Sequence, residues 1–119
     1  MSLIDSDSLN LDERFLNLVS YRQSLVAGNI ANLDTPGYKT HDIDFHAEMR
    51  RAMSAPEAPS TPMAKEVPGL MQRPDGNDVS IDRESMALAE VQMQYRVGVE
   101  LVRHEVRMVN MALKDGATS

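Results

Sequence analysis

The sequence predicts an all-α fold: an antiparallel, coiled-coil-like pair of long N- and C-terminal helices, with an irregular Pro-rich segment between them. Three observations lead to this prediction. Apolar residues recur at helical spacing near the N-terminus. All six Pro lie between residues 34 and 79, and the C-terminal third is Pro-free and periodic. We therefore divide the chain into an N-terminal axial helix (1–33), a middle segment with a turn, a short helix and a flexible stretch (34–80), and a C-terminal axial helix (81–119).

The N-terminal helix is expected over residues 10–33. Asn10 is placed to be its N-cap, with Glu13 completing a capping box. Pro36 and Gly37 follow the periodic segment, so the helix should end near Leu33. One stripe of the helix carries apolar residues with two polar interruptions: Leu11, Phe15, Leu18, Arg22, Leu25, Val26 and Asn29.

The middle segment should contain little regular structure. A short helix is expected over residues 44–53, capped by Asp44, with Phe45, Met49 and Met53 on one side. Five Pro crowd the residues after Ser54 and exclude a continuous helix or a central strand there. The sequence Asp-Gly-Asn-Asp at residues 75–78 is typical of a turn.

The C-terminal helix is expected over residues 82–113, capped by Ser80 or Asp82 and ending near Lys114 and Gly116. Its length, about 48 Å at about 1.5 Å per residue, exceeds what a compact domain of this size needs. It carries apolar residues on two opposite sides, and the N-terminal helix can cover only one. The predicted packing stripe is Leu88, Val91, Tyr95, Val99, Val102, Val106 and Val109. The predicted inter-subunit stripe is Met86, Met93, Val97, Leu101, Met108 and Met111.

Composition excludes several classes of function. The net charge of −6 argues against nucleic acid, whose phosphates require a basic surface. No apolar run approaches a membrane span, and the N-terminus lacks the basic and apolar regions of a cleaved signal peptide. The absence of Cys excludes disulfides and thiolate chemistry. No nucleophile–base pair or phosphate loop is present, so neither an enzyme nor a cofactor is expected.

One short segment gathers side chains that can bind metals: His41, Asp42, Asp44 and His46. Their spacing is not a recognised ligand pattern, and such residues near a turn are common. We therefore predict no metal site.

The segment from Gly28 to Phe45, GNIANLDTPGYKTHDIDF, joins the N-terminal helix to the middle. It resembles the signature of the flagellar rod and hook proteins, in which a terminal helix ends in Ala-Asn followed by Thr-Pro-Gly-Tyr. The matching residues are Asn29, Ala31, Asn32, Thr35, Pro36, Gly37 and Tyr38. The short chain without a large inserted domain, and the segments at residues 77–82 and 86–102, are similar to proteins of the proximal rod.

This resemblance implies a structural subunit of the basal-body rod, the channel-containing shaft that transmits torque. It also implies export by the flagellar type III apparatus without a cleaved signal, and a location in the periplasm. The implied partners are further copies, the other proximal rod proteins, the adaptor FliE and the export gate. The alternative is a small acidic helical adaptor or export chaperone of the flagellar or type III secretion system, which would bind client proteins without itself being exported.

Overall fold

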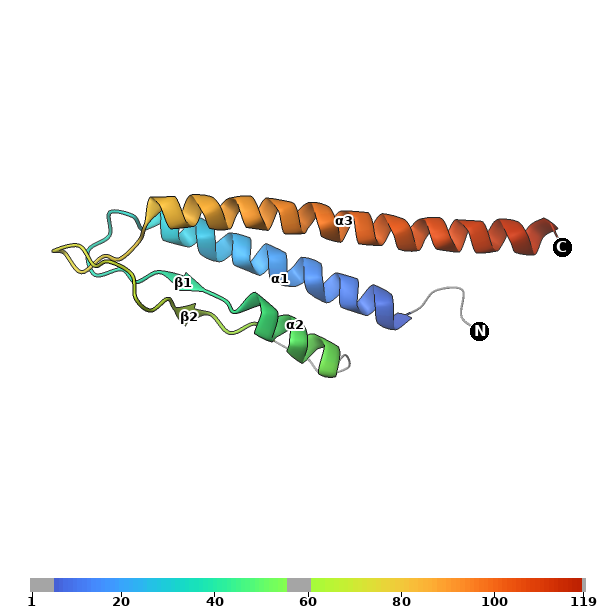
Figure 1. Cartoon of the computed structure of the whole chain (residues 1–119), viewed down its shortest axis with the longest axis horizontal. Helices are drawn as coiled ribbons and strands as arrows, with labels where there is room; N and C mark the ends of the chain where they lie inside the picture. The colour runs from blue at the N-terminus through green and yellow to red at the C-terminus, as the bar shows by residue number, and fades with distance from the viewer. Residues whose placement is uncertain (1–5, 56–60, 119) are drawn as a thin grey trace.

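The computed structural model describes residues 6–55 and 61–118. The molecule is elongated, with extents of 72 × 25 × 17 Å and a radius of gyration of 18.9 Å. A compact domain of this length has a radius of gyration of about 14 Å. The elements in chain order are α1 (Ser6–Ala31), β1 (His41–Asp42), α2 (Phe45–Ser54), β2 (Lys65–Glu66) and α3 (Ile81–Thr118) (Figure 1).

Helices α1 and α3 lie side by side in opposite directions (Figure 1). Three hydrogen bonds record the antiparallel register. Ser8 Oγ donates to Glu105 Oε1 (2.6 Å), Arg22 Nη1 to Glu90 Oε2 (2.9 Å) and Asn29 Nδ2 to Glu84 Oε2 (3.1 Å). The numbers rise on α1 as they fall on α3, so the predicted antiparallel pair is confirmed.

The side of α3 that packs on α1 is centred on Gly98. A Cβ atom built on Gly98 would lie 2.5 Å from Leu16 Cδ2 and 3.1 Å from the Phe15 ring, so α1 approaches the α3 backbone closely here. Of the predicted packing stripe, Val91 is 2 % exposed. The stripe is wrong for Tyr95 and Val106, which are 50 % and 52 % exposed.

The physical reason for this error is the small size of the residues at the true contact. Glu84, Ala87, Val91 and Gly98 are buried, and at about 100° per residue they centre roughly 50° away from the predicted stripe. Ala and Gly contribute little to an apolar pattern but allow two backbones to approach. The remaining members of the predicted stripe, Leu88, Val99, Val102 and Val109, are half-buried.

The buried apolar side chains occupy the half of the molecule nearest the α1–α3 connection. Val19, which the predicted stripe omitted, is 0 % exposed. Phe15 of α1 meets Phe45 of α2 edge to face, with ring centroids 5.5 Å apart. The buried hydrophobic residues are Leu18, Val19, Val26, Ile43, Ala52, Val79, Ala87 and Val91. The core is therefore confined to one half, and α3 continues beyond it.

Both long helices differ from their predicted bounds. Helix α1 begins at Ser6, so Asn10 lies inside it and is not its N-cap. The polar residues before Asn10 contain no Pro or Gly that would stop a helix, and Ser8 anchors the extra turn to Glu105. Helix α3 runs to Thr118, past Lys114 and Gly116. A single Gly in a helix costs about 1 kcal/mol, which does not by itself end a long one.

The start of α3 and the short helix follow the prediction. Ser80 Oγ accepts a hydrogen bond from the Arg83 amide (3.3 Å), so Ser80 caps α3. Asp44 caps α2 by accepting from the Ala47 amide at 3.1 Å. Met53 is 64 % exposed, and Ala52 occupies the buried side of α2 in its place.

The fold is mostly helical but not all-α. Strands β1 and β2 pair antiparallel, with His41 opposite Glu66 and Asp42 opposite Lys65. The Val67 amide extends this pairing by donating to the Thr40 carbonyl at 2.9 Å. The paired residues lie between Pro62 and Pro68, where no Pro removes a donor, so a two-residue ladder fits within the Pro-rich segment.

The close approach at Gly98 leads to a prediction about stability. Gly98→Val should lower the free energy of unfolding by about 1–3 kcal/mol, because the added side chain overpacks against Leu16 and Phe15. The control is Gly116→Ala, where nothing lies within 4 Å of the added Cβ. Urea unfolding followed by circular dichroism measures both. Equal stability of the Gly98→Val variant and the wild type would contradict the close packing.

Candidate functional site

The signature segment lies where α1 ends, and Asn29 is at its centre. Asn29 is 0 % exposed, and its amide group makes four hydrogen bonds. Nδ2 donates to the His41 carbonyl (2.8 Å) and to Glu84 Oε2 (3.1 Å). Oδ1 accepts from the Tyr38 hydroxyl (3.2 Å) and from the His41 amide (3.1 Å). One side chain thus joins α1, the segment entering β1, and α3.

The Tyr38 hydroxyl is held in its protonated form. Burial raises the pKa of Tyr38, and the nearby negative charge of Glu84 raises it further. The hydroxyl therefore remains a donor to Asn29 over the physiological pH range. The ring folds back and meets the His41 ring edge-on, with centroids 5.9 Å apart.

A second buried amide, from Asn77, closes the turn from the other side. Asn77 is 0 % exposed, and its Nδ2 donates to the carbonyls of Asn32 (2.9 Å) and Thr35 (2.8 Å). Asn32 in turn donates from Nδ2 to the Gly28 carbonyl at 2.8 Å and accepts from Thr35 Oγ1 at 3.0 Å. Each of these three carbonyls also accepts a backbone amide just after α1, so the side-chain amides add a second donor to the turn.

Two glycines allow the turn at residues 34–38 to touch the turn at residues 75–77. Gly37 has φ +75° and Gly76 has φ +87°, both in the region that favours glycine. The Gly37 amide donates to the Asp75 carbonyl at 2.9 Å, and a Cβ on Gly76 would lie 3.3 Å from Gly37 Cα. The expected turn at residues 75–78 is therefore present, and it packs directly on the signature.

Asp78 fixes the strand that follows the signature. Its Oδ1 accepts from the Thr40 amide at 2.6 Å and from the Thr40 hydroxyl at 2.9 Å. Thr40 is 0 % exposed, so both groups are shielded from water. Arg73 adds a further link by donating to the carbonyls of Val79 and Leu33.

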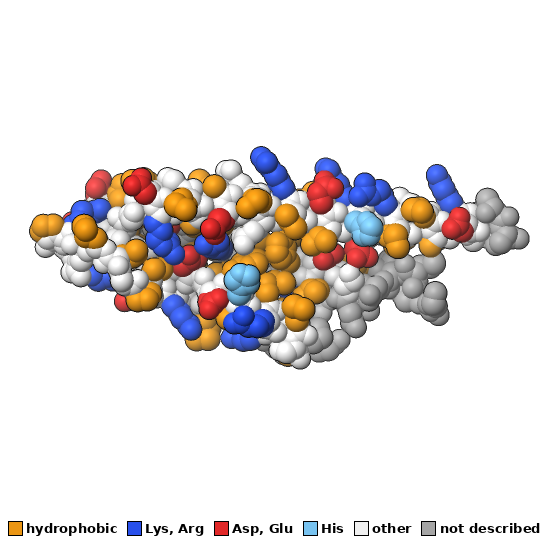
Figure 2. Space-filling model, viewed as in Figure 1, with side chains coloured by type: hydrophobic (Ala, Val, Ile, Leu, Met, Phe, Trp, Pro, Cys, Tyr) orange, Lys and Arg blue, Asp and Glu red, His pale blue; other side chains and the backbone are white. Residues whose placement is uncertain are grey.

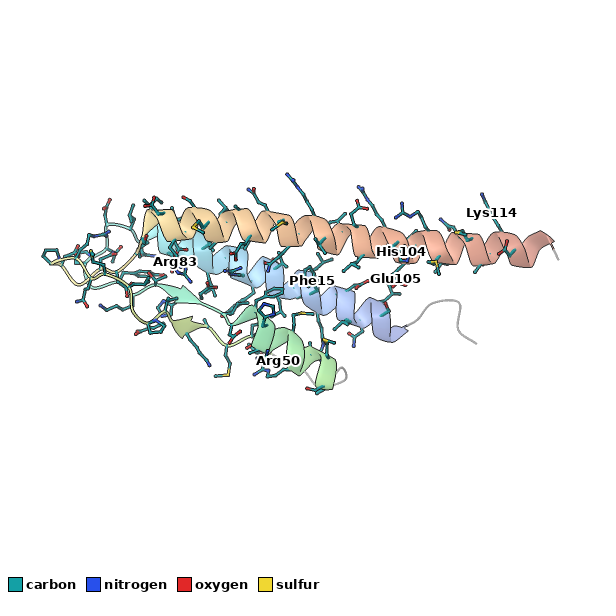
Figure 3. All side chains as sticks on the ribbon, in the orientation of Figure 1. Phe15, Arg50, Arg83, His104, Glu105 and Lys114 are labelled. Carbon is teal, nitrogen blue, oxygen red and sulfur yellow. The ribbon has the colours of Figure 1, made fainter. Side chains whose placement is uncertain are left out.

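A network of charged residues lies beside Asn29. Arg22 Nε donates to Asp42 Oδ1 (3.1 Å), and Arg83 Nη2 donates to Asp42 Oδ2 (2.7 Å). Arg83 Nη1 also reaches Glu84 Oε1 at 2.9 Å, and the Ile43 amide donates to Asp42 Oδ1 at 2.8 Å. Figure 3 shows Arg83 at the first turn of α3, close to the end of α1. The network connects α1, β1 and α3 by charge-assisted bonds.

These contacts set the ionisation of Asp42 and Arg22. Burial alone would raise the pKa of Asp42, but hydrogen bonds from Arg22, Arg83 and the Ile43 amide outweigh it and leave the pKa lowered. Burial would lower the pKa of Arg22, but hydrogen bonds to Asp42 and Glu90 leave it raised. Both groups are therefore charged at neutral pH.

The structure brings most of the signature residues together. Asn29, Asn32, Thr35, Gly37 and Tyr38 are joined by hydrogen bonds at the turn. Thr35 and Gly37 are exposed, as are Ala31 and Pro36. The stripe predicted for residues 10–33 includes Arg22 and Asn29 as its polar interruptions. Their partners Asp42 and Glu84, and the further polar partners Asn77, Asp78 and Arg83, are not predicted as partners from the sequence. The signal was present as polar residues on stripes expected to be buried.

The considered metal cluster does not converge as a ligand set. Both oxygens of Asp42 are occupied by Arg22 and Arg83, and Asp44 caps α2. Within residues 6–55 and 61–118, no three His, Asp or Glu side chains are grouped as metal ligands would be.

The second candidate site is the exposed apolar stripe of α3. Figure 2 shows hydrophobic side chains spread along the surface of α3. The exposed fractions of the predicted inter-subunit residues are 70 % for Met86, 62 % for Met93, 48 % for Val97, 42 % for Leu101, 54 % for Met108 and 61 % for Met111. Their contact with another molecule remains a prediction. In the described part of the chain, no helix has the length and apolar character that crossing a membrane requires.

Comparison with known proteins defines the class. Residues 16–39, which contain the whole signature, match the family described as Flagella basal body rod protein. The chain is 33 % identical over 129 residues to the flagellar basal body rod protein FlgB of Borrelia hermsii, covering 90 % of this chain and 96 % of that one. It is 29 % identical to FlgB of Salmonella typhimurium over 130 residues, covering 92 % and 94 % of the two chains. FlgB of Escherichia coli K12 is 28 % identical, with the same coverage.

The chain belongs to the FlgB family of flagellar basal-body rod proteins. It is a structural rod subunit of the flagellar basal body.

The position of Asn29 leads to a second prediction. Asn29→Asp should destabilise the protein at pH 7 by about 3 kcal/mol or more, because it removes two donors and places a carboxylate beside Glu84 without a proton between them. The control is Asn17→Asp, the same change at an exposed position of α1. Thermal unfolding measures the difference. Equal losses in the two variants would show that the buried amide does not organise this end of the molecule.

The pKa of Asp42 leads to a third prediction, concerning pH. Because its folded pKa is lowered from 3.8, Asp42 stabilises the protein above that pH, and this contribution is lost as the pH falls through the folded value. Asp42→Asn should therefore cost about 3 kcal/mol at pH 7. The difference from wild type should shrink below about pH 4.

Urea unfolding at pH 7 and at low pH measures this effect. The charged groups facing Asp42 are Arg22 on α1 and Arg83 on α3, with Glu84 and Glu90 behind them. Asp44→Asn is the control, because Asn caps a helix as well as Asp. A stability difference between wild type and Asp42→Asn that stays constant down to low pH would contradict the assignment.

Proposed function

We propose that the chain assembles through its terminal helices into the proximal rod, as part of a tubular, channel-containing shaft that transmits torque for motility. It leaves the cytoplasm through the flagellar type III export apparatus, without a cleaved signal peptide, and resides in the periplasmic rod. Its neighbours are copies of itself, the other proximal rod proteins, the adaptor FliE and the export gate. Its role is mechanical, with no catalytic chemistry.

The exposed stripe of α3 is the observation that carries this proposal. Helix α1 can cover only the side of α3 around Gly98, and the stripe from Met86 to Met111 stays in water in the isolated chain. Helix α3 is about 57 Å long. A row of apolar side chains along it suits side-by-side packing between elongated subunits of the same kind. Met adapts to irregular partner surfaces, so several different axial proteins can pack on one stripe.

The signature turn suits the same role. Its buried amides and ion pairs fix the angle between α1 and α3 at the end of the molecule where residues 32–80 connect the two helices, which we call the closed end. A subunit that transmits torque must keep this angle under load, and cooperative buried polar networks resist distortion because each broken bond leaves an unsatisfied group.

The test is a double substitution on the stripe, Met93→Lys with Leu101→Lys. Both side chains are exposed, so the purified chain should keep its helix content and solubility. Rod growth should stop, because each subunit would bring two cations into an apolar contact. Counts of basal bodies that carry a rod, by electron microscopy in a strain lacking the native protein, give the result.

The matched control is Met53→Lys with Met71→Lys, two Met that are 64 % and 90 % exposed and lie outside the stripe. It should support normal rods. Normal rod counts with the stripe variant would refute the inter-subunit role of the stripe. An export chaperone would behave differently: basal bodies would contain none of the protein, and the variant would lose client binding.

A further inference from the structure

The open end of the helix pair is the end that contains the start of α1 and the C-terminal half of α3. It holds two carboxyl groups that face each other. Asp12 of α1 is 8 % exposed, and its Oδ2 has no hydrogen-bond partner. Glu105 lies across from it on α3 and accepts from Ser8 Oγ at 2.6 Å. Figure 3 shows Glu105 pointing from α3 toward α1. Within residues 6–55 and 61–118, neither carboxyl group is paired with a Lys or Arg.

This arrangement differs from the buried carboxylates at the closed end. Asp42 and Glu84 are each held by an arginine at 2.7 to 2.9 Å. Asp12 has no such partner, and burial, followed by the charge of Glu105, raises its pKa. The pair therefore destabilises the isolated chain at neutral pH. Local conflicts of this kind in an otherwise satisfied structure are expected where a partner completes the site.

A row of basic side chains runs along the opposite side of α3. Each member lies two or nine residues from Glu105, which at about 100° per residue places it roughly 160–180° away around the helix. Figure 2 shows basic side chains projecting along the edge of α3 that faces away from α1, and Lys114 is labelled there in Figure 3. The row consists of Arg96, Arg103, Arg107 and Lys114.

Arginines of this row can form ion pairs with a neighbouring molecule. Arg103 pairs with Glu100 at 3.1 Å, but both side chains are more than 60 % exposed, so this pair is weak. Arg107 has no hydrogen-bond or ion-pair partner among the described residues. The chain as a whole has a net charge of −6, so a basic row is not a by-product of composition.

The arginines of the basic row and the carboxyl pair also lie at the same position along the long axis of the molecule. Arg103 and Arg107 lie only two residues from Glu105, or about 3 Å along the helix axis. Two copies that stand side by side in the same orientation would therefore bring these arginines level with the carboxyl pair. Complementary patches on opposite sides of one chain form a head-to-tail contact, which repeats around a ring or a helix.

We propose that the Asp12–Glu105 pair receives an arginine, Arg107 or Arg103, from the basic row of a second copy of this chain standing beside it. This inference rests on the proposed function, because it specifies the lateral contact between copies in the rod. The guanidinium reaches the pair at Glu105, which is half-buried, because Asp12 Oδ2 itself is buried, and its charge offsets the repulsion between the two carboxylates. The subunit thereby gains stability on assembly that it does not have alone.

The first test separates stability from assembly. Asp12→Asn should raise the melting temperature of the purified chain, because the repulsion disappears, yet lower rod counts at least about tenfold. A purely structural role would move both quantities in the same direction. Wild-type rod counts with Asp12→Asn, or a lower melting temperature, would overturn the proposal.

The second test is a charge exchange. Arg107→Glu alone should also lower rod counts, whereas Arg50→Glu, the same change on the exposed side of α2, should not. Asp12→Lys combined with Arg107→Glu should recover rods above either single variant, because the introduced lysine supplies a cation with which both Glu105 and the introduced glutamate of the neighbouring copy can pair. A double variant no better than the two singles would overturn the pairing.

The third test locates the contact directly. The chain has no Cys, so the pair Asp12→Cys and Arg107→Cys reports only the intended contact. Within one chain these positions face opposite sides of α3, so a link that joins two chains can form only between copies. Because an arginine–carboxylate contact keeps the two Cα atoms farther apart than a disulfide spans, basal bodies treated with a short bifunctional maleimide should give a ladder of linked subunits on a gel. Monomers alone, in basal bodies that contain the protein, would overturn the proposal and leave the proposed function intact. Absence of even the wild-type protein from basal bodies would instead refute the proposed function.

Discussion

The side-chain amide of Asn29 joins three segments of the chain at a position that water does not reach. It holds the last turn of α1 to the backbone of His41 and to Glu84 of α3, and it accepts the Tyr38 hydroxyl. Every hydrogen-bonding position of the amide is used inside the protein. An amide is the only uncharged side-chain group that offers two donors and an acceptor in one plane, so no apolar residue of similar volume can replace it. The turn and the crossing of the long helices both depend on this group.

The charged network extends the same constraint. Glu84 binds Arg83, Arg83 binds Asp42, and Asp42 binds Arg22 on α1. Each group is buried or half-buried, so each needs its neighbour to remain satisfied. Polar networks of this kind specify one arrangement, because any shift leaves several groups unpaired. The closed end of the molecule is therefore the part whose geometry is most tightly fixed.

The two ends of the molecule consequently have different properties. The closed end contains the buried apolar core, the signature turn and the satisfied polar groups. Toward the open end, α3 exposes Leu101, Met108 and Met111, and Asp12 keeps an oxygen without a partner. An elongated subunit of a rod needs both properties. A fixed end preserves its shape under load, and an incomplete end leaves apolar and charged groups for its neighbours to cover.

The sequence by itself determined the two long helices and, because the segment that connects them is short, their antiparallel pairing. It also determined the short helix capped by Asp44 and the turn at Gly37. These features follow from local patterns: apolar periodicity, the absence of Pro after residue 80, cap residues, and Pro or Gly where a helix must stop. The signature also sufficed for the family, because its residues form a long and specific pattern. The same local rules failed at the start of α1 and at the end of α3, where a weak cap or stop signal does not outweigh continued helix.

Only the tertiary structure decided which side of α3 faces α1, and which polar residues are partners. Hydrophobic spacing predicted Tyr95 and Val106 at the contact, but both are exposed. Phe15 and Leu16 approach Gly98 closely, so the side of α3 that carries its smaller residues faces α1. Asn29 with Glu84 and Asp42 with Arg83 are separated by 55 and 41 positions in the chain, so no local pattern could pair them. Such contacts exist only after the helices have packed, because burial is what makes an amide or a carboxylate require a specific partner.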